Sequence, residues 1–280
     1  MYPRAFDYVA VSSVDEAVRE LGNAEMAKVM SGGMSLIPLM KLRLFSPDLV
    51  VDISRIDGMG DITDKGDHWS IGALATHRDT ASSALPTALT TAAAWTGDVQ
   101  VRNRGTTCGA VAHADIAADQ PSAVLALGGT MVAHGPNGTR EIPADDFFVD
   151  VLTSALEPNE ILTEIRIPKR GGGSAYDKLG RRGGHTDYAV AGASAWVSKN
   201  GSVSEARVAL TGVGTKSTLA EGVMEAIVGT DGSDSAVESA AERAIEGVTV
   251  LEDLYGSVEY KTHLAKVMVK RALSQAIANA

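Results

Sequence analysis

The chain has 280 residues, of which 45% are hydrophobic, and a formal net charge of −10. This acidic balance argues against general nucleic-acid binding, which needs a basic surface, and the sequence contains no apolar run of about 18 residues that would predict a membrane-spanning helix. The single cysteine excludes an internal disulfide and leaves too few thiolates to hold an iron–sulfur cluster.

The N-terminal end of the chain predicts a small unit of helix and strand. Ser13 and Glu16 have the spacing of a capping box, so we expect a helix over residues 13–22. The short segments 27–30 and 48–53 are rich in apolar residues and predict two strands. A β–α–β grouping is therefore expected at the start of the chain.

Two adjacent glycines follow the first of these strands, within residues 31–36. Gly32 and Gly33 let the backbone turn tightly and approach a ligand closely, because no Cβ intervenes. The backbone N–H groups of such a turn suit an anion, usually a phosphate. The signal is weak by itself, because turns from strand to helix are often rich in glycine.

The middle of the chain predicts strands separated by helices. Thr76 has the character of an N-cap, and His77 is interpreted as a surface residue at the start of that helix rather than as a ligand. The expected elements are strands at 68–74 and 160–168, a hairpin at 130–142, and helices at 88–95 and 121–127.

A boundary is expected at residues 169–174, where three glycines follow two cations and indicate a linker or a mobile loop. The apolar residues of the last helix share one face, and its basic residues, Lys261 among them, are expected mostly on the other side. The elements expected beyond the linker are strands at 194–197 and 205–210, and helices at 218–228, 234–246 and 257–278.

A second stretch rich in glycine and small residues, 101–121, changes the interpretation of the first. Residues 31–41 and 102–119 together resemble two motifs of the FAD-binding (medium) subunits of molybdenum hydroxylases, the family of carbon monoxide dehydrogenase and xanthine dehydrogenase. The motifs of the carbon monoxide dehydrogenase branch are the most similar. The resemblance extends over nearly the whole chain, because residues 253–261 also match a C-terminal segment of the family.

The resemblance implies an α+β fold with a PCMH-type (vanillyl-alcohol-oxidase-like) FAD-binding domain. This domain would consist of two subdomains and be followed by a small C-terminal α+β domain with a three-stranded sheet and helices. The implied boundaries are 1–57 for the first FAD-binding subdomain, 58–170 for the second and 174–280 for the C-terminal domain. No Gly-x-Gly-x-x-Gly fingerprint occurs, so FAD is not expected in a doubly wound domain.

The resemblance also assigns a cofactor site, without a catalytic residue or a metal ligand. Backbone N–H groups of the first turn and the Ser35 hydroxyl would wrap the FAD pyrophosphate, with a facing turn at 106–110. Asp119 would bond the ribityl part, Lys178 would lie at the pyrimidine edge of the flavin, and Tyr188 would cover its ring. The implied cofactor-binding residues are Val29, Met30, Ser31, Gly32, Gly33, Met34, Ser35, Leu36, Thr106, Cys108, Gly109, Ala110, Asp119, Ile161, Leu162, Lys178 and Tyr188.

Four positions depart from the family motifs. Met34 replaces a residue that is often His, Cys108 replaces a Gly, Ala110 replaces an Asn, and Ile116 replaces a Pro. A cysteine at a position of close approach adds a side chain, and Ala110 removes a hydrogen-bonding group. The strength and geometry of flavin binding are therefore open at this point.

The implied function is that of an oxidoreductase subunit in electron transfer. The chain would carry FAD, take electrons from two-iron two-sulfur clusters of a small partner subunit, and reduce an external acceptor. A large partner subunit would oxidise the substrate at molybdopterin, and a dimer of heterotrimers is expected. The substrate, carbon monoxide or an N-heterocycle, would be chosen on that large subunit.

Two alternatives remain at this stage: a stand-alone flavin oxidoreductase of the same fold, and a scaffold subunit that has lost flavin. The N-terminus lacks the pattern of a signal peptide, so we expect a cytoplasmic protein, with peripheral association at an inner membrane left open.

Overall fold

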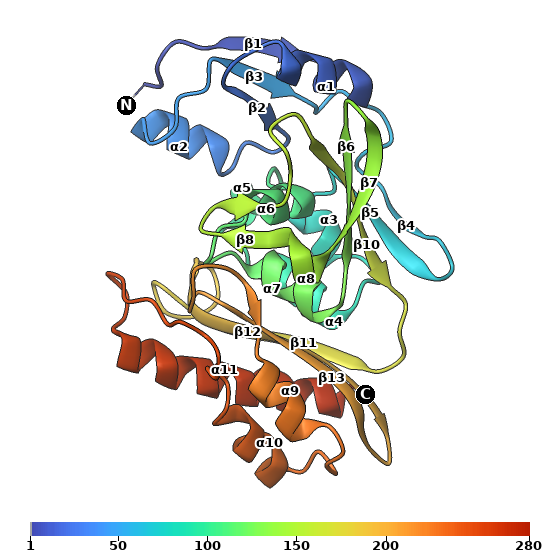
Figure 1. Ribbon diagram of the computed structural model, residues 1–280, viewed down its shortest axis with the longest axis vertical. Helices are drawn as coiled ribbons and strands as arrows, with labels where there is room; N and C mark the ends of the chain where they lie inside the picture. The colour runs from blue at the N-terminus through green and yellow to red at the C-terminus, as the bar shows by residue number, and fades with distance from the viewer. Residues whose placement is uncertain (1) are drawn as a thin grey trace.

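The computed structural model describes residues 2–280, which form four sheets with their helices, arranged along the long axis of the molecule (Figure 1). The first strands lie at one end, the largest sheet in the middle and the C-terminal residues at the other end. Among the residues described, no helix combines the length and the apolar character needed to cross a bilayer.

The N-terminal end is a parallel sheet with the strand order β1-β3-β2. Ser13 caps its first helix by accepting a hydrogen bond from the Glu16 backbone, as the sequence predicts. Strand β1 was not predicted, and its four residues are exposed or half-buried. The elements are β1 Asp7–Ala10, α1 Val14–Gly22, β2 Ala27–Met30, α2 Leu36–Leu42 and β3 Leu49–Asp52.

The middle of the molecule is built on a five-stranded sheet with the order β4-β5-β10-β6-β7, in which all neighbours are antiparallel. A two-stranded ribbon, β8 with β9, lies beside it. The strands are β4 Ile62–Asp64, β5 His68–Gly72, β6 Thr130–Gly135, β7 Gly138–Pro143, β8 Phe148–Asp150, β9 Thr153–Ser154 and β10 Ile161–Pro168. The helices are α3 His77–Ala81, α4 Thr87–Ala94, α5 Val99–Arg102, α6 Thr107–His113, α7 Asp119–Ala126 and α8 Ala144–Phe147.

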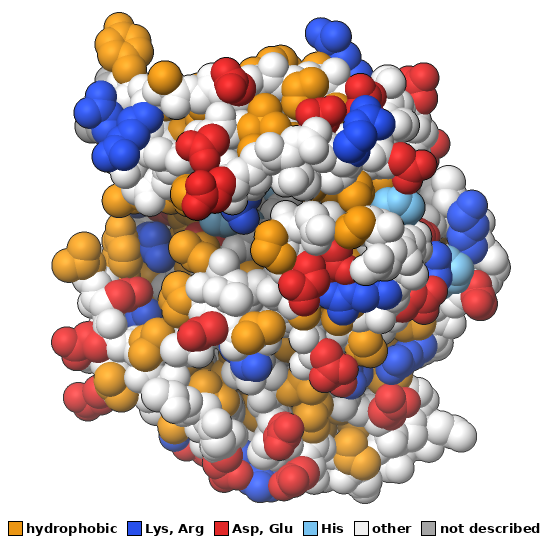
Figure 2. Space-filling view, turned by 45° about the horizontal axis from the view of Figure 1, so that its top comes forward, with side chains coloured by type: hydrophobic (Ala, Val, Ile, Leu, Met, Phe, Trp, Pro, Cys, Tyr) orange, Lys and Arg blue, Asp and Glu red, His pale blue; other side chains and the backbone are white. Residues whose placement is uncertain are grey.

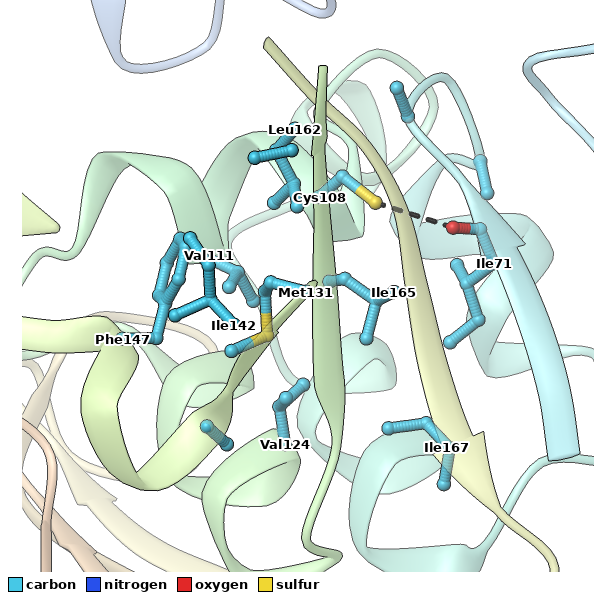
Figure 3. Close-up of a cluster of buried hydrophobic side chains, with 14 of the residues drawn as sticks. Ile71, Cys108, Val111, Val124, Met131, Ile142, Phe147, Leu162, Ile165 and Ile167 are labelled. Atoms are coloured by element: carbon cyan, nitrogen blue, oxygen red, sulfur yellow. Dashed lines mark hydrogen bonds between the residues drawn. The ribbon is translucent and has the colours of Figure 1, made fainter. Parts of the chain in front are cut away.

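The main core lies between this sheet and the helices beside it (Figure 3). Met131 of β6 points toward Phe147 of α8, and Ile165 of β10 and Val111 of α6 belong to the same cluster, in which all four side chains are buried. Helix α7 is buried along its whole length, because it also contacts strands of the C-terminal sheet. A helix that is buried on all sides has no polar face toward solvent, so its sequence does not show the alternation of polar and apolar faces that predicts a surface helix.

The C-terminal end is an antiparallel sheet with the order β11-β12-β13-β14, packed on a long helix. Most of its buried residues form a second core, whereas Tyr176, Trp196 and Ala209 belong to the first. Together with the middle of the chain, this sheet confirms the predicted α+β architecture. The elements are β11 Gly173–Gly180, β12 Ala189–Asn200, β13 Ser202–Thr211, β14 Thr218–Leu219, α9 Glu221–Ile227, α10 Asp234–Ala241 and α11 Val258–Ala278.

Two predictions in this region are wrong, and the expected linker is shorter than predicted. Residues 169–172 lie outside any helix or strand, β11 begins at Gly173, and a Cβ on Gly172 would lie 2.3 Å from the Val197 carbonyl oxygen, so this segment is closely packed. Residues 218–219 form the fourth strand instead of the start of a helix. Lys261 is buried and not on the exposed side of α11, because its Nζ binds Asp253 at 2.7 Å and the Gly212 carbonyl at 3.0 Å.

Candidate cofactor site

A cavity of about 680 Å³ opens between the N-terminal sheet and the middle of the molecule. Its walls come from the turn between β2 and α2, from helix α6, and from the segment that includes β9 and the start of β10. Figure 2 shows the surface hollowed below the N-terminal end. The volume lies within the range of cofactor and ligand pockets, about 300–1,000 Å³.

The first glycine turn presents unpaired hydrogen-bond donors to this cavity. Gly33 has a φ of +73°, a left-handed conformation that favours glycine. In residues 2–280, no protein acceptor engages the backbone N–H groups of Gly32, Gly33, Met34 or Ser35, all of which line the cavity. Gly32 is buried, and buried N–H groups normally have an acceptor. These donors are therefore placed to bind acceptor atoms of a ligand.

The second glycine turn packs directly against the first. A Cβ on Gly32 would lie 1.9 Å from the Arg104 carbonyl oxygen, so only glycine fits there. The Ser31 and Thr106 hydroxyl oxygens are 2.9 Å apart, and Thr106 accepts a hydrogen bond from the Gly109 backbone at the start of α6. The two stretches that the sequence analysis paired are therefore in contact.

Most residues of the predicted site line this cavity. The exceptions are Asp119, Lys178 and Tyr188. The residues that line it are Val29, Met30, Ser31, Gly32, Gly33, Met34, Ser35, Leu36, Thr106, Cys108, Gly109, Ala110, Ile161 and Leu162.

Cys108 does not add bulk to the cavity through its thiol. The side chain is buried and points toward β5, where Sγ lies 3.5 Å from the Ile71 carbonyl oxygen (Figure 3). Burial raises the pKa of the Cys108 thiol, so the group stays protonated and acts as a small apolar side chain. The side chain that this departure from the family motif adds is therefore part of the hydrophobic core.

Asp119 and Lys178 form a buried ion pair beyond the cavity lining. Lys178 Nζ lies 2.7 Å from one carboxylate oxygen of Asp119 and 2.8 Å from the other, and it also donates to the Asp187 carbonyl at 2.6 Å. The Tyr176 hydroxyl donates to the same carboxylate. Burial raises the pKa of Asp119, and the contact with Lys178 opposes that shift.

Tyr188 stands at the end of a loop that reaches the first glycine turn. Its ring stacks with the Arg181 guanidinium, at 5.1 Å, and burial raises the pKa of its hydroxyl while the Ser35 hydroxyl lowers it. The same guanidinium also lies 4.4 Å from the centre of the Tyr255 ring. The structure therefore brings Tyr188 near Ser35, although the residue as a whole is 41% exposed.

His77 was not predicted as a site residue, but it lines the cavity and is only 3% exposed. Its backbone N–H donates to the Gly105 carbonyl at 2.9 Å, so the start of α3 is joined to the second glycine turn. Burial lowers the pKa of His77 to about 4, and the imidazole is neutral at physiological pH. The interpretation of His77 as a surface residue is wrong. Its ring packs beside Gln120 of the buried helix α7, and the sequence alone does not show that these two residues are neighbours.

Comparison with known proteins agrees with this geometry. Residues 4–170 match the family described as the FAD binding domain in molybdopterin dehydrogenase, and residues 174–276 match the CO dehydrogenase flavoprotein C-terminal domain. The chain belongs to this family of FAD-binding subunits. It is an oxidoreductase subunit with FAD as its cofactor, and the resemblance stated from the sequence is confirmed.

Individual relatives match over their full length. The carbon monoxide dehydrogenase medium chain of Hydrogenophaga pseudoflava is 42% identical, with 99% of this chain and 98% of the relative covered. The nicotine 6-hydroxylase medium subunit of Paenarthrobacter nicotinovorans is 31% identical, with 97% of each chain covered.

Solved structures show the same fold. A structure of the Hydrogenophaga pseudoflava carbon monoxide dehydrogenase that lacks the Mo-pyranopterin moiety matches with a TM-score of 0.94, at 41% identity and full coverage of both chains. Quinoline 2-oxidoreductase from Pseudomonas putida 86 matches with a TM-score of 0.92, at 31% identity and 99% coverage of both chains.

Proposed function

We propose that this chain holds FAD between its two glycine turns and relays electrons from iron–sulfur clusters of a partner subunit to an external acceptor. The observation that carries the proposal is the row of unpaired N–H groups at Gly32, Gly33, Met34 and Ser35, directed to a cavity of suitable size. The pyrophosphate of FAD offers the acceptor oxygens that these donors lack.

The remaining walls divide into polar and apolar parts. Thr106, Gly109 and Ala110 face the first turn, while Ile161 and Leu162 offer an apolar surface for a flat ring. When bound, FAD supplies the redox chemistry, and the protein supplies its position and surroundings. Asp119, Lys178 and Tyr188 are proposed to contact the flavin end of the cofactor where it extends beyond the cavity described here.

Partners follow from the relatives and from the composition. The relatives are medium chains or subunits of larger dehydrogenases, and the single cysteine of this chain cannot hold an iron–sulfur cluster. We therefore place the clusters on a small subunit and molybdopterin on a large one, assembled as a dimer of heterotrimers. We also propose that the complex is cytoplasmic, either free in the cytoplasm or peripherally associated with the inner membrane.

The substrate is set by the large subunit. Relatives are named for carbon monoxide, nicotine and quinoline, although their medium subunits share this fold. A binding site for the substrate is thus not expected on this chain.

The test is the absorption spectrum of the chain purified with its partner subunits, followed by release and identification of the chromophore. We expect flavin absorption and about one FAD per chain, together with iron–sulfur and molybdenum signals. A folded, colourless complex without FAD would contradict the proposal and favour a scaffold role.

A further inference from the structure

His77 lines the cavity, and one of its two ring nitrogens has no hydrogen-bond partner among residues 2–280. Its Nδ1 lies 3.1 Å from the Gln120 side-chain amide, whereas no hydrogen bond within residues 2–280 engages its Nε2. Nε2 faces the second glycine turn, because a Cβ on Gly105 would lie 3.1 Å from it. Both His77 and Gly105 line the cavity.

The neighbouring groups determine which nitrogen carries the proton. The Gln120 amide nitrogen is 2.5 Å from the Thr96 hydroxyl, whose single proton is donated to the Ala92 carbonyl at 2.8 Å. The amide NH₂ must therefore donate to Thr96, because the opposite orientation would set two oxygens against each other without a proton between them. The second amide hydrogen then points to Nδ1, which accepts it.

A neutral imidazole that accepts at Nδ1 carries its proton on Nε2. The ring is consequently a donor beside Gly105 at the cavity wall, where Gln120 binds its other nitrogen and the His77 backbone N–H binds the Gly105 carbonyl. Lys28 is the single Lys or Arg among the residues that line the cavity, so neutral donors must satisfy much of an anionic ligand.

We propose that His77 is a cofactor-binding residue, whose Nε2–H donates a hydrogen bond to an oxygen of FAD where the cofactor passes Gly105. This inference rests on the proposed function, because it requires FAD in the cavity between the two glycine turns. It adds a cofactor-binding residue that lies outside both motifs, and it connects the cofactor through the His77 ring and the Gln120 amide to the Thr96 hydroxyl.

Two amide substitutions separate the two nitrogens of the ring. Gln in place of His77 sets its amide nitrogen near the position of Nε2 and keeps the donor. Asn places its amide near the position of Nδ1 and retains the contact with Gln120, but it lacks the donor. A purely structural role for the ring would make Asn the milder change, whereas the proposal makes Gln the milder one.

The experiment uses the complex with its partner subunits, stripped of FAD and titrated with FAD while flavin fluorescence is recorded. We expect His77→Asn to raise the Kd for FAD about tenfold and His77→Gln to change it by about twofold or less. Equal affinity of the Asn variant and the wild type, or a Gln variant as weak as the Asn variant, would overturn the inference. Failure of the wild-type complex to bind FAD would instead overturn the proposed function.

A second measurement covers the case in which the variants fold poorly. In a crystal structure of the wild-type complex with FAD, the distance from His77 Nε2 to an FAD oxygen should be within about 3.2 Å. A ring that turns away from the cofactor, or a separation beyond hydrogen-bond distance, would contradict the proposal without any substitution.

Discussion

Gly32 is the residue at which the two turns of the cavity come closest. We expect Gly32→Ala to force the turns apart, because its Cβ would meet a backbone carbonyl at 1.9 Å and not a flexible side chain. The Kd of the complex for FAD should rise about tenfold or more. Gly60→Ala is the matched control, because a Cβ at Gly60 has no neighbour within 4 Å. If both variants bind FAD like the wild type, contact between the turns does not shape the site.

His77 also makes the stability of the chain depend on pH. Burial lowers its pKa from 6.5 to about 4, so the unfolded chain binds more protons than the folded chain between these values. The contribution of the neutral ring to the free energy of unfolding is therefore complete above pH 6.5 and is lost as the pH falls toward 4. The loss is about 2 kcal/mol between pH 7 and pH 5. In urea unfolding, His77→Gln should lose correspondingly less stability over this interval. A parallel loss in both proteins would contradict the assignment of a buried neutral ring.

At the scale of elements, the N-cap of α6 joins local structure to the site. Thr106 accepts from the Gly109 backbone at 3.0 Å and lies 2.9 Å from the Ser31 hydroxyl. Thr106→Val keeps the shape but removes both contacts, and we expect it to lower the free energy of unfolding by about 1–2 kcal/mol. Thr106→Ser keeps the hydroxyl and should remain near the wild type in urea unfolding. Equal losses in the two variants would show that the methyl group, not the cap, is responsible.

Local signals explain which elements could be predicted from the sequence. The helix after Ser13 and the hairpin around Pro136 and Asn137 have a cap or a turn of their own, and both are found. Strand β11, by contrast, begins with the last of three glycines, and its packing comes from β12 and α11. The residue pattern within β11 does not predict that it packs against β12 and α11. The domain boundaries at 57 and 170 stay predictions.

The candidate site divides in the same way. The glycine turns were predicted because their chemistry is local, and they do line the cavity. The place of His77 depends on Gln120, which is 43 residues away in the chain. The thiol of Cys108 faces β5 for a similar reason, since its surroundings are assembled by a sheet that closes only in the fold.

For the whole molecule, the ion pair of Lys178 and Asp119 joins the C-terminal sheet to the buried helix α7. Both side chains are at most 4% exposed, and Lys178 also binds the Trp95 carbonyl at 3.2 Å. Lys178→Met would leave the carboxylate buried without its cation, so we expect a loss of about 3–5 kcal/mol in the free energy of unfolding. The transition in urea should show this loss with unchanged cooperativity, because the pair lies at the contact between the middle of the molecule and the C-terminal sheet.

The control for this prediction is a lysine whose ion pair is exposed to solvent. Lys270 on α11 pairs with Glu238 of α10 at 2.7 Å, and the two side chains are 47% and 65% exposed. Such pairs contribute about 0–1 kcal/mol, because water screens the charges and both side chains lose freedom. Lys270→Met should therefore unfold close to the wild type. If Lys178→Met also unfolds close to the wild type, the buried ion pair does not stabilise the contact between the C-terminal sheet and α7. Its charges would then act on the cofactor and not on the stability of the fold.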